Sequence, residues 1–191
     1  MVTIRTADPD RDSPELLDIY RPYVEKTAIT FEYTTPTADE FRQRMKKTLE
    51  MYPYLVAESD GKIAGYAYVS PFVGREAYSH SVETSIYLAP ESRHQGIGRR
   101  LYTALEDVLK TMHVYNLNAC IGVSEIGTTL PFLDNNSMDF HTHMGYRLVG
   151  RFHRCGYKFQ TWLDMVWMEK MIGERPDNPE PLLPYASVRK F

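Results

Sequence analysis

Cysteine is scarce in this sequence: Cys120 and Cys155 are the only two among 191 residues. A disulfide-stapled scaffold is therefore excluded, because such domains use several bridges in place of a large core. Both cysteines stand in strand-like stretches, so we expect buried free thiols in a reducing compartment. This favours a cytoplasmic protein.

Long apolar runs, a leader sequence and an excess of basic residues are also missing. No apolar stretch reaches the roughly 18 residues typical of a membrane-spanning helix, so we expect no membrane contact. Residues 1–10 have no basic region followed by an apolar one, and we expect no secretory signal. The net charge of −3 argues against nucleic-acid binding, which usually needs a basic domain.

The composition that remains is that of a globular domain, with 43% hydrophobic and 25% charged residues. This apolar content is enough for one core, and we expect a single domain over residues 1–172. Residues 173–191 are proline-rich, a composition typical of a flexible tail. They also contain apolar side chains such as Leu183 and Tyr185. We therefore expect the tail to pack on its own chain or on a partner.

The most informative stretch is 83–112, which reads as a strand, a turn and a helix. The helix is indicated by apolar residues that recur on one face of a 3.6-residue period. They are Ile97, Leu101, Leu105, Val108, Leu109 and Met112. The turn before it, Arg-His-Gln-Gly-Ile-Gly at 93–98, is called the glycine-rich turn below. A helix N-terminus offers unpartnered N–H groups and a dipole that favours anions, and glycine lets a ligand approach the backbone closely. The pattern predicts a phosphate site.

Two common phosphate-binding motifs do not fit the glycine-rich turn. A P-loop requires Lys and Ser or Thr after its last glycine, where this sequence has Arg99 and Arg100. A dinucleotide fingerprint requires a third glycine where Leu101 stands. What remains is R-x-x-G-x-G directly after a strand. Taken alone, this pattern also fits a tight strand-to-helix turn whose basic residues lie in solvent.

The rest of the chain predicts a mixed α/β sheet with helices on both faces. Ser13 and Pro14 indicate the start of a first helix, which Pro22 would kink or end. Thr37 and Glu40 form a capping box for a second helix. Asp60-Gly61 predicts a hairpin, and Gly145 a helix end. The expected strands are 2–5, 54–58, 63–70, 79–88, 117–123, 148–159 and 162–170, and the expected helices begin at 14, at 37, at 97 and near 136 or 137.

Residues 3–170 resemble the phosphinothricin acetyltransferase branch of the GNAT superfamily of N-acetyltransferases. The motifs that carry the resemblance are Y-P-Y-L-V-A-E at 52–58, D-G-K-I-A-G at 60–65, E-T-S-I-Y-L at 83–88, the glycine-rich turn, F-H-x-x-M-G-Y at 140–146, G-Y-K-F at 156–159 and W-x-D-M-V at 162–166. The loop 124–136 is longer than in those enzymes. The resemblance implies a mostly antiparallel sheet of about seven strands, acetyl-CoA as cosubstrate, no metal and a homodimer.

The resemblance also implies which residues hold the coenzyme. The strand Ile86-Tyr87-Leu88 would offer main-chain groups to pantetheine and the acetyl carbonyl. Asn136 would contact pantetheine, with Asn135 as the alternative. The diphosphate would be bound by the glycine-rich turn, with Arg99 and Arg100 near the 3′-phosphate, although a solvated basic helix start explains these two arginines equally. The residues of this phosphate site are Arg93, His94, Gln95, Gly96, Ile97, Gly98 and Arg99.

Two residues are candidates for catalysis. Glu83, the only carboxylate on its strand, corresponds to the general base of the family, and the alternative is a glutamate in solvent at a sheet edge. His141 stands where many of these enzymes carry a tyrosine that protonates the coenzyme thiolate. The alternative for His141 is a histidine bonded to a neighbouring carbonyl. His141 and His143 point about 200° apart on a helix and cannot share a metal ion, so we assign none.

The acceptor side is indicated by four residues. Phe31 lies in a loop that lines the acceptor site in the family, Arg75 and Tyr78 precede the Glu83 strand, and Lys158 belongs to the last hairpin. Arg75 or Lys158 would bind a carboxylate, so we expect a small amino-acid-like acceptor of the phosphinothricin or methionine sulfoximine type. Two alternatives stay open: a non-catalytic acyl-CoA-binding regulator, and an enzyme that acetylates peptides or proteins.

Overall fold

The structure is a computed structural model that describes residues 2–189. Its helices and strands follow one another in the predicted order, with a short last helix and two 3₁₀ turns in addition. The elements are β1 (Val2–Thr6), α1 (Pro9–Lys26), α2 (Ala38–Met51), β2 (Tyr54–Ser59), β3 (Lys62–Pro71), η1 (Glu76–Tyr78), β4 (Ser81–Leu88), η2 (Pro90–Ser92), α3 (Ile97–Thr111), β5 (Asn116–Val123), α4 (Asn136–His143), β6 (Arg147–Lys158), β7 (Thr161–Met171) and α5 (Tyr185–Val188). The seven strands have the order β1-β2-β3-β4-β5-β7-β6. This confirms the mixed α/β sheet.

The chain divides into two compact units by its internal contacts. The first holds the residues up to Ile19, Pro36–Leu117 and those from Met171 on, and the second holds Tyr20–Thr35 and Asn118–Lys170. The single domain expected for 1–172 stays a prediction, and each unit is described by itself below.

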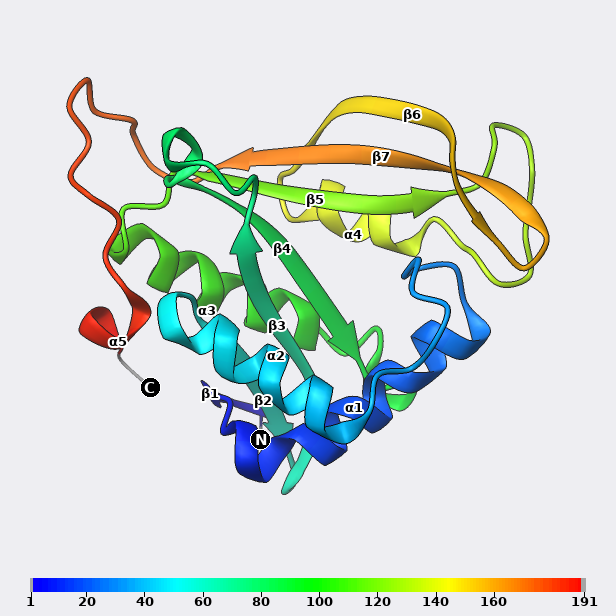
Figure 1. Ribbon diagram of the computed structural model, residues 1–191, viewed down its shortest axis with the longest axis horizontal. Coiled ribbons are helices and arrows are strands. Elements are labelled where there is room, and N and C mark those ends of the chain that lie inside the picture. The colour runs from blue at the N-terminus through cyan, green and yellow to red at the C-terminus, as the bar shows by residue number, and fades with distance from the viewer. Residues whose placement is uncertain (1, 190–191) are drawn as a thin grey trace. The chain divides into compact units, whose positions relative to one another are not determined.

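The first unit is built on the antiparallel strands β1 to β4. Helices α2 and α3 lie on opposite faces of these strands, α2 in front and α3 behind in Figure 1. The middle strand β2 is apolar and fully buried at Leu55, Val56 and Ala57 because both of its faces are covered. The apolar face expected for α3 is buried as well, including Leu101 and Leu105.

Local sequence signals in this unit have the predicted outcome. The side chain of Thr37 accepts from the backbone N–H of Glu40, and the Glu40 carboxylate accepts from the N–H of Thr37, which completes the capping box of α2. Asp60 and Gly61 have φ values of 52° and 80°, as a turn with two left-handed residues requires.

The start of α1 differs from the prediction. The helix begins at Pro9, ahead of the expected cap at Ser13, because the Asp8 carboxylate accepts from the N–H groups of Asp10 and Arg11 at 3.0 and 3.3 Å. The helix also continues to Lys26, so Pro22 does not end it.

The second unit contains β5, α4 and the β6–β7 hairpin. The hairpin is antiparallel and has a register shift between Phe152 and Gly156. Helix α4 ends as predicted: Gly145 has φ 89°, and the Tyr146 N–H donates to the His141 carbonyl at 2.9 Å.

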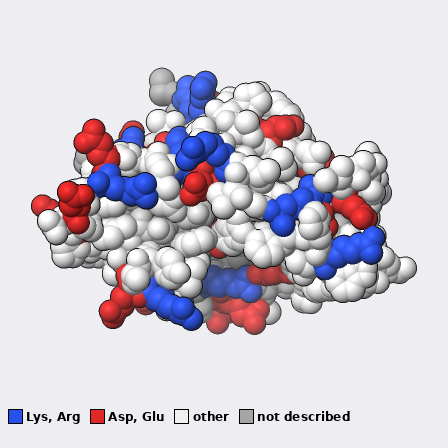
Figure 2. Space-filling view, turned by 90° about the horizontal axis from the view of Figure 1, so that it is seen from above, with Lys and Arg blue, Asp and Glu red and all other residues white. Residues whose placement is uncertain are grey.

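The expectation that both cysteines are buried is wrong, whereas the expectation that they form no disulfide is confirmed. Cys120 and Cys155 are both exposed. The prediction failed because a strand-like pattern does not show which face of the strand is covered. No helix among residues 2–189 combines the length and apolarity that crossing a bilayer requires. On the face drawn in Figure 2, basic and acidic side chains are interspersed.

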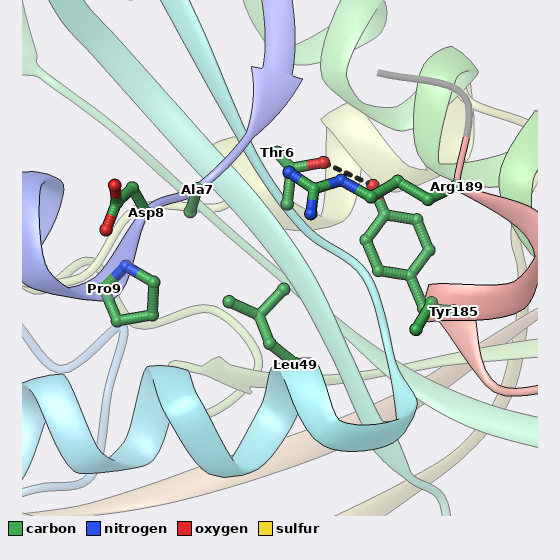
Figure 3. Close-up of a pocket in the computed structure, with 8 residues that line it drawn as sticks. Thr6, Ala7, Asp8, Pro9, Leu49, Tyr185 and Arg189 are labelled. Atoms are coloured by element: carbon green, nitrogen blue, oxygen red, sulfur yellow. Dashed lines mark hydrogen bonds between the residues drawn. The ribbon is translucent and has the colours of Figure 1, made fainter.

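The C-terminal tail lies along the first unit. The Leu183 N–H donates to the Met112 carbonyl at 3.1 Å, and the buried Tyr185 hydroxyl bonds Thr6 Oγ1 at 2.6 Å. Figure 3 shows this contact beside a cavity of about 300 Å³ between the β1–α1 turn, α2 and α5. No residue of β4 or of the glycine-rich turn lines the cavity.

Candidate functional site

The glycine-rich turn has the geometry of an anion site. Gly96 is the N-cap of α3 and has φ 75°, a conformation that strains other residue types. The first helical bond runs from Arg100 N–H to the Gly96 carbonyl at 3.2 Å. Within residues 2–189, the N–H groups of His94 to Arg99 donate to no protein acceptor. A row of unpaired amides at the positive end of a long helix suits a phosphate.

Strand β4 leads into this turn and is held close to β3 by a glycine. Gly65 pairs with Leu88, and a Cβ at Gly65 would lie 2.7 Å from the Tyr87 carbonyl and 2.5 Å from Leu88 Cδ2. Only glycine therefore allows this approach. The predicted coenzyme residues Ile86 to Leu88 and the glycine-rich turn are consecutive parts of one strand–turn–helix unit.

Alternation along β4 determines the direction of the Glu83 side chain. Thr84 bonds the buried Tyr102 of α3, so Glu83 faces the opposite side, toward α2. Tyr87 shares that side, because its ring packs at 5.4 Å from the ring of Tyr66, which in turn contacts Phe41 of α2. Glu83 thus lies on an aromatic face of the sheet.

The Glu83 carboxylate is partly buried and has no compensating partner. Burial raises its pKa above the usual glutamate value, and no cation opposes this effect. The side chain of Glu83 makes no ion pair or hydrogen bond with any residue in 2–189. A carboxylate in this state accepts a proton more readily than one in solvent. Glu83 is therefore not a solvent-exposed glutamate at a sheet edge, which was the alternative interpretation.

Arg75 and Tyr78 lie in the β3–β4 connection at the Glu83 end of the strand pair. Ser70 pairs with Glu83 across these strands. Tyr78 packs edge-on against Phe72 with ring centroids 6.0 Å apart. Arg75 is exposed and forms no ion pair within residues 2–189. The structure therefore brings an unpaired guanidinium, a tyrosine and the candidate base to one end of β4.

The surroundings of His141 do not suit a residue that donates a proton to the coenzyme thiolate. It is 3% exposed, its Nδ1 donates to the Ser137 carbonyl at 2.7 Å, and its ring meets Tyr146 edge-on at 5.0 Å. Burial lowers its pKa to about 4, so the ring is neutral near pH 7. Its only ring proton is then the one on Nδ1. This is the alternative considered for His141, and the predicted acid role has no support in this geometry.

The two asparagines stand at the start of α4. Asn135 is the N-cap without a side-chain capping bond. Asn136 is exposed, and its Nδ2 donates to Asp134 at 2.6 Å. Which of them contacts pantetheine stays a prediction.

Lys158 has an environment that the sequence did not indicate. It is 3% exposed, and its Nζ donates to the carbonyl oxygens of Val24, Thr27 and Thr30, each at 2.8 Å. All three ammonium protons are used, so none remains for an acceptor carboxylate. Phe31, in contrast, is 36% exposed. Among the residues that the structure describes, no group of His, Cys, Asp or Glu is arranged to hold a metal ion.

Comparisons with known proteins agree with this geometry. A family model described as "Acetyltransferase (GNAT) domain" matches residues 4–167. The chain is 36% identical over 172 residues to a phosphinothricin N-acetyltransferase of Alcaligenes faecalis, over 90% of this chain and 83% of the relative. It is 27% identical to an L-methionine sulfoximine/L-methionine sulfone acetyltransferase of Salmonella typhimurium, over 91% and 96% of the two chains.

A solved structure is similar over almost the whole chain. It is a GNAT superfamily phosphinothricin acetyltransferase from Sinorhizobium meliloti in complex with acetyl-CoA, with a TM-score of 0.82 and 32% identity. The similarity covers 96% of this chain and 98% of that one. The chain thus shares its fold with a protein whose structure was solved in complex with the coenzyme.

Proposed function

The chain belongs to the GNAT acetyltransferase family, and we propose that it transfers the acetyl group of acetyl-CoA to the amine of a small amino-acid-like acceptor. The relatives named for phosphinothricin and methionine sulfoximine support this acceptor class. The observation that carries the proposal is the Glu83 carboxylate, which is partly buried, raised in pKa and without a cation partner. A protein that only bound acyl-CoA would have no use for it.

The proposed roles follow from the chain's own groups. The bound coenzyme supplies a thioester whose carbonyl carbon accepts the amine. The amides of the glycine-rich turn hold its diphosphate, with Arg93 and Arg99 adding positive charge. Glu83 removes the proton from the acceptor ammonium, directly or through one water, because only the neutral amine has a lone pair for attack. As the C–N bond forms, the C–S bond breaks, and the leaving thiolate takes up the second proton that the nitrogen loses, so that the products are the amide and the free coenzyme thiol.

Arg75 is the residue that we propose to bind the acceptor carboxylate. Its guanidinium is exposed, lies at the Glu83 end of β4 and forms no ion pair within the described chain. An arginine can bind a carboxylate through two parallel hydrogen bonds, which also orients the acceptor amine.

An acceptor panel tests the proposal through release of the free coenzyme thiol. We expect turnover with phosphinothricin and methionine sulfoximine. Arg75→Gln should raise their KM by about 10-fold or more, as the loss of a charged hydrogen bond predicts. A matched amine without the carboxylate should be a poor acceptor for both proteins and show no effect of the substitution. Turnover with peptides or polyamines alone would refute this acceptor class, and acetyl-CoA binding without turnover would identify a binding module.

We also propose that the protein is a homodimer that uses the edge strand β6. Leu148, Val149 and Phe152 of this strand are 57%, 60% and 53% exposed. An edge strand with several exposed apolar side chains tends to pair with another chain.

Light scattering during size-exclusion chromatography tests this dimer. The wild type should elute with twice the mass of the chain, and the double variant with Leu148→Glu and Phe152→Glu should elute as a folded monomer, because two carboxylates cannot be buried without partners. A monomeric wild type at micromolar concentration would contradict the dimer.

A further inference from the structure

Residues 27–35, called the 27–35 segment below, form neither helix nor strand, yet the second unit holds them closely. They follow the last residue of α1, Lys26. Such a segment needs tertiary contacts to keep one conformation, because its backbone has no regular ladder of hydrogen bonds. Three kinds of contact come from outside the segment, and most of them originate at residues 156–158 in the β6–β7 hairpin.

The first contact is the lysine. Nζ of Lys158 donates one proton each to the carbonyl oxygens of Val24, Thr27 and Thr30, all at 2.8 Å. Val24 belongs to the last turn of α1, where carbonyl groups lack helical partners and the dipole favours a cation. The lysine therefore joins the end of the helix to the first half of the segment. This arrangement is called the lysine clamp below.

The second contact is a slot for the aromatic ring of Phe31. A Cβ at Gly156 would lie 2.3 Å from Phe31 Cε2, and one at Gly122 would lie 2.9 Å from Phe31 Cε1. The ring thus lies directly on two glycine backbones, where a side chain would displace it. One part of the ring is packed in this way, and 36% of the residue remains exposed.

Further bonds complete the support. The Ala28 N–H donates to the Phe132 carbonyl at 2.9 Å, and the buried Tyr20 hydroxyl bonds Thr30 Oγ1 at 3.0 Å. The Tyr33 hydroxyl donates to the Tyr157 carbonyl. Gly156, Tyr157 and Lys158 are consecutive, so one stretch of β6 supplies one side of the slot, the carbonyl that accepts the Tyr33 hydrogen bond, and the lysine clamp.

We propose that Lys158 is a positioning residue for the acceptor site: its ammonium fixes the 27–35 segment so that the exposed part of Phe31 is presented to the acceptor. This inference rests on the proposed function together with the expectation, implied by the resemblance to the family, that Phe31 contributes to acceptor binding. It replaces the direct carboxylate contact predicted for Lys158, because an ammonium with three carbonyl partners has no proton left to donate. Lys158 does not touch the reacting groups and is not a catalytic residue.

The first test uses Lys158→Met, which keeps an unbranched chain and removes the three donors. Hydrogen exchange followed by mass spectrometry should show faster exchange that is confined to the 27–35 segment. In steady-state kinetics, the KM for the acceptor should rise by about 10-fold or more, since misplaced positioning groups cost this much. Calorimetry should give an unchanged Kd for acetyl-CoA. Lys110→Met, at an exposed lysine of α3, is the matched control and should change none of these quantities.

A second variant keeps the lysine and disturbs only the ring. Gly156→Ala places a methyl group where Phe31 lies, so it should raise the acceptor KM in the same way and leave acetyl-CoA binding intact. If Lys158→Met does not fold, Gly156→Ala alone still tests whether the position of Phe31 affects the acceptor KM. A merely structural role predicts a lower Tm with an unchanged acceptor KM in both variants, and that result would overturn the inference. A wild type that acetylates no amine refutes the proposed function instead, and the exchange experiment still decides whether the clamp orders the segment.

Discussion

Glu83→Gln is expected to lower kcat/KM for acetyl transfer by at least about 100-fold, the range in which a general base contributes. The amide has nearly the same shape but cannot accept the proton of the acceptor ammonium. Glu83 is not part of the glycine-rich turn, so the Kd for acetyl-CoA should stay within about 3-fold of the wild type, a difference below about 0.7 kcal/mol. Stopped-time assays of thiol release and calorimetry measure the two quantities.

The matched control is Glu76→Gln, an exposed glutamate in the turn before β4, which should leave both quantities unchanged. The pH profile gives an independent check. Because burial raises the pKa of Glu83, activity should fall as the pH drops through a value above that of an ordinary glutamate, where the base becomes protonated. If Glu76→Gln lost as much activity as Glu83→Gln, Glu83 would not be the general base. The same would follow if the residual activity of Glu83→Gln fell over the same acidic pH range as that of the wild type.

Gly96→Val is expected to weaken acetyl-CoA binding by at least about 10-fold. A β-branched residue at φ 75° is strained by roughly 1–2 kcal/mol or more, and relief of this strain turns the amides of the glycine-rich turn away from the diphosphate. Calorimetric titration with acetyl-CoA measures the loss.

Gly61→Val separates this effect from general destabilisation. Gly61 has φ 80°, and a Cβ there would meet no atom within 4 Å, as at Gly96. Both variants should lose a similar free energy of unfolding, measured by urea denaturation, because both carry the same backbone strain. Only the Gly96 variant should lose coenzyme affinity. If Gly61→Val weakened acetyl-CoA binding as much as Gly96→Val, the loss would not come from the amides of the glycine-rich turn, and these amides would not be the contact to the diphosphate.

Much of the fold was predictable because its signals are local. The capping box of Thr37, the Asp60-Gly61 hairpin and the αL residue Gly145 each depend on neighbours in the chain, and the structure confirms all three. The apolar face of α3 repeats often enough to be unambiguous. Where local signals compete, the prediction failed: Ser13-Pro14 looks like a helix start, but the Asp8 carboxylate caps the helix earlier.

The site was predictable only in part, because side-chain surroundings depend on distant residues. The glycine-rich turn is contiguous, and its geometry follows from the strand, turn and helix around it. The lysine clamp joins residues more than a hundred positions apart, so Lys158 looked like a free cation in the sequence. The burial of His141 and the exposure of both cysteines likewise depend on which face of an element is covered.

The most direct test of the account compares acetyl-CoA with S-acetylpantetheine by calorimetry on the wild type. If the amides around Gly96 bind the diphosphate, acetyl-CoA should bind at least about 100-fold more tightly, since hydrogen bonds to charged groups contribute roughly 1.5–3 kcal/mol each. Acetyl-dephospho-CoA, which keeps the diphosphate, should stay close to acetyl-CoA. Equal affinity for acetyl-CoA and S-acetylpantetheine would contradict a diphosphate site at this turn.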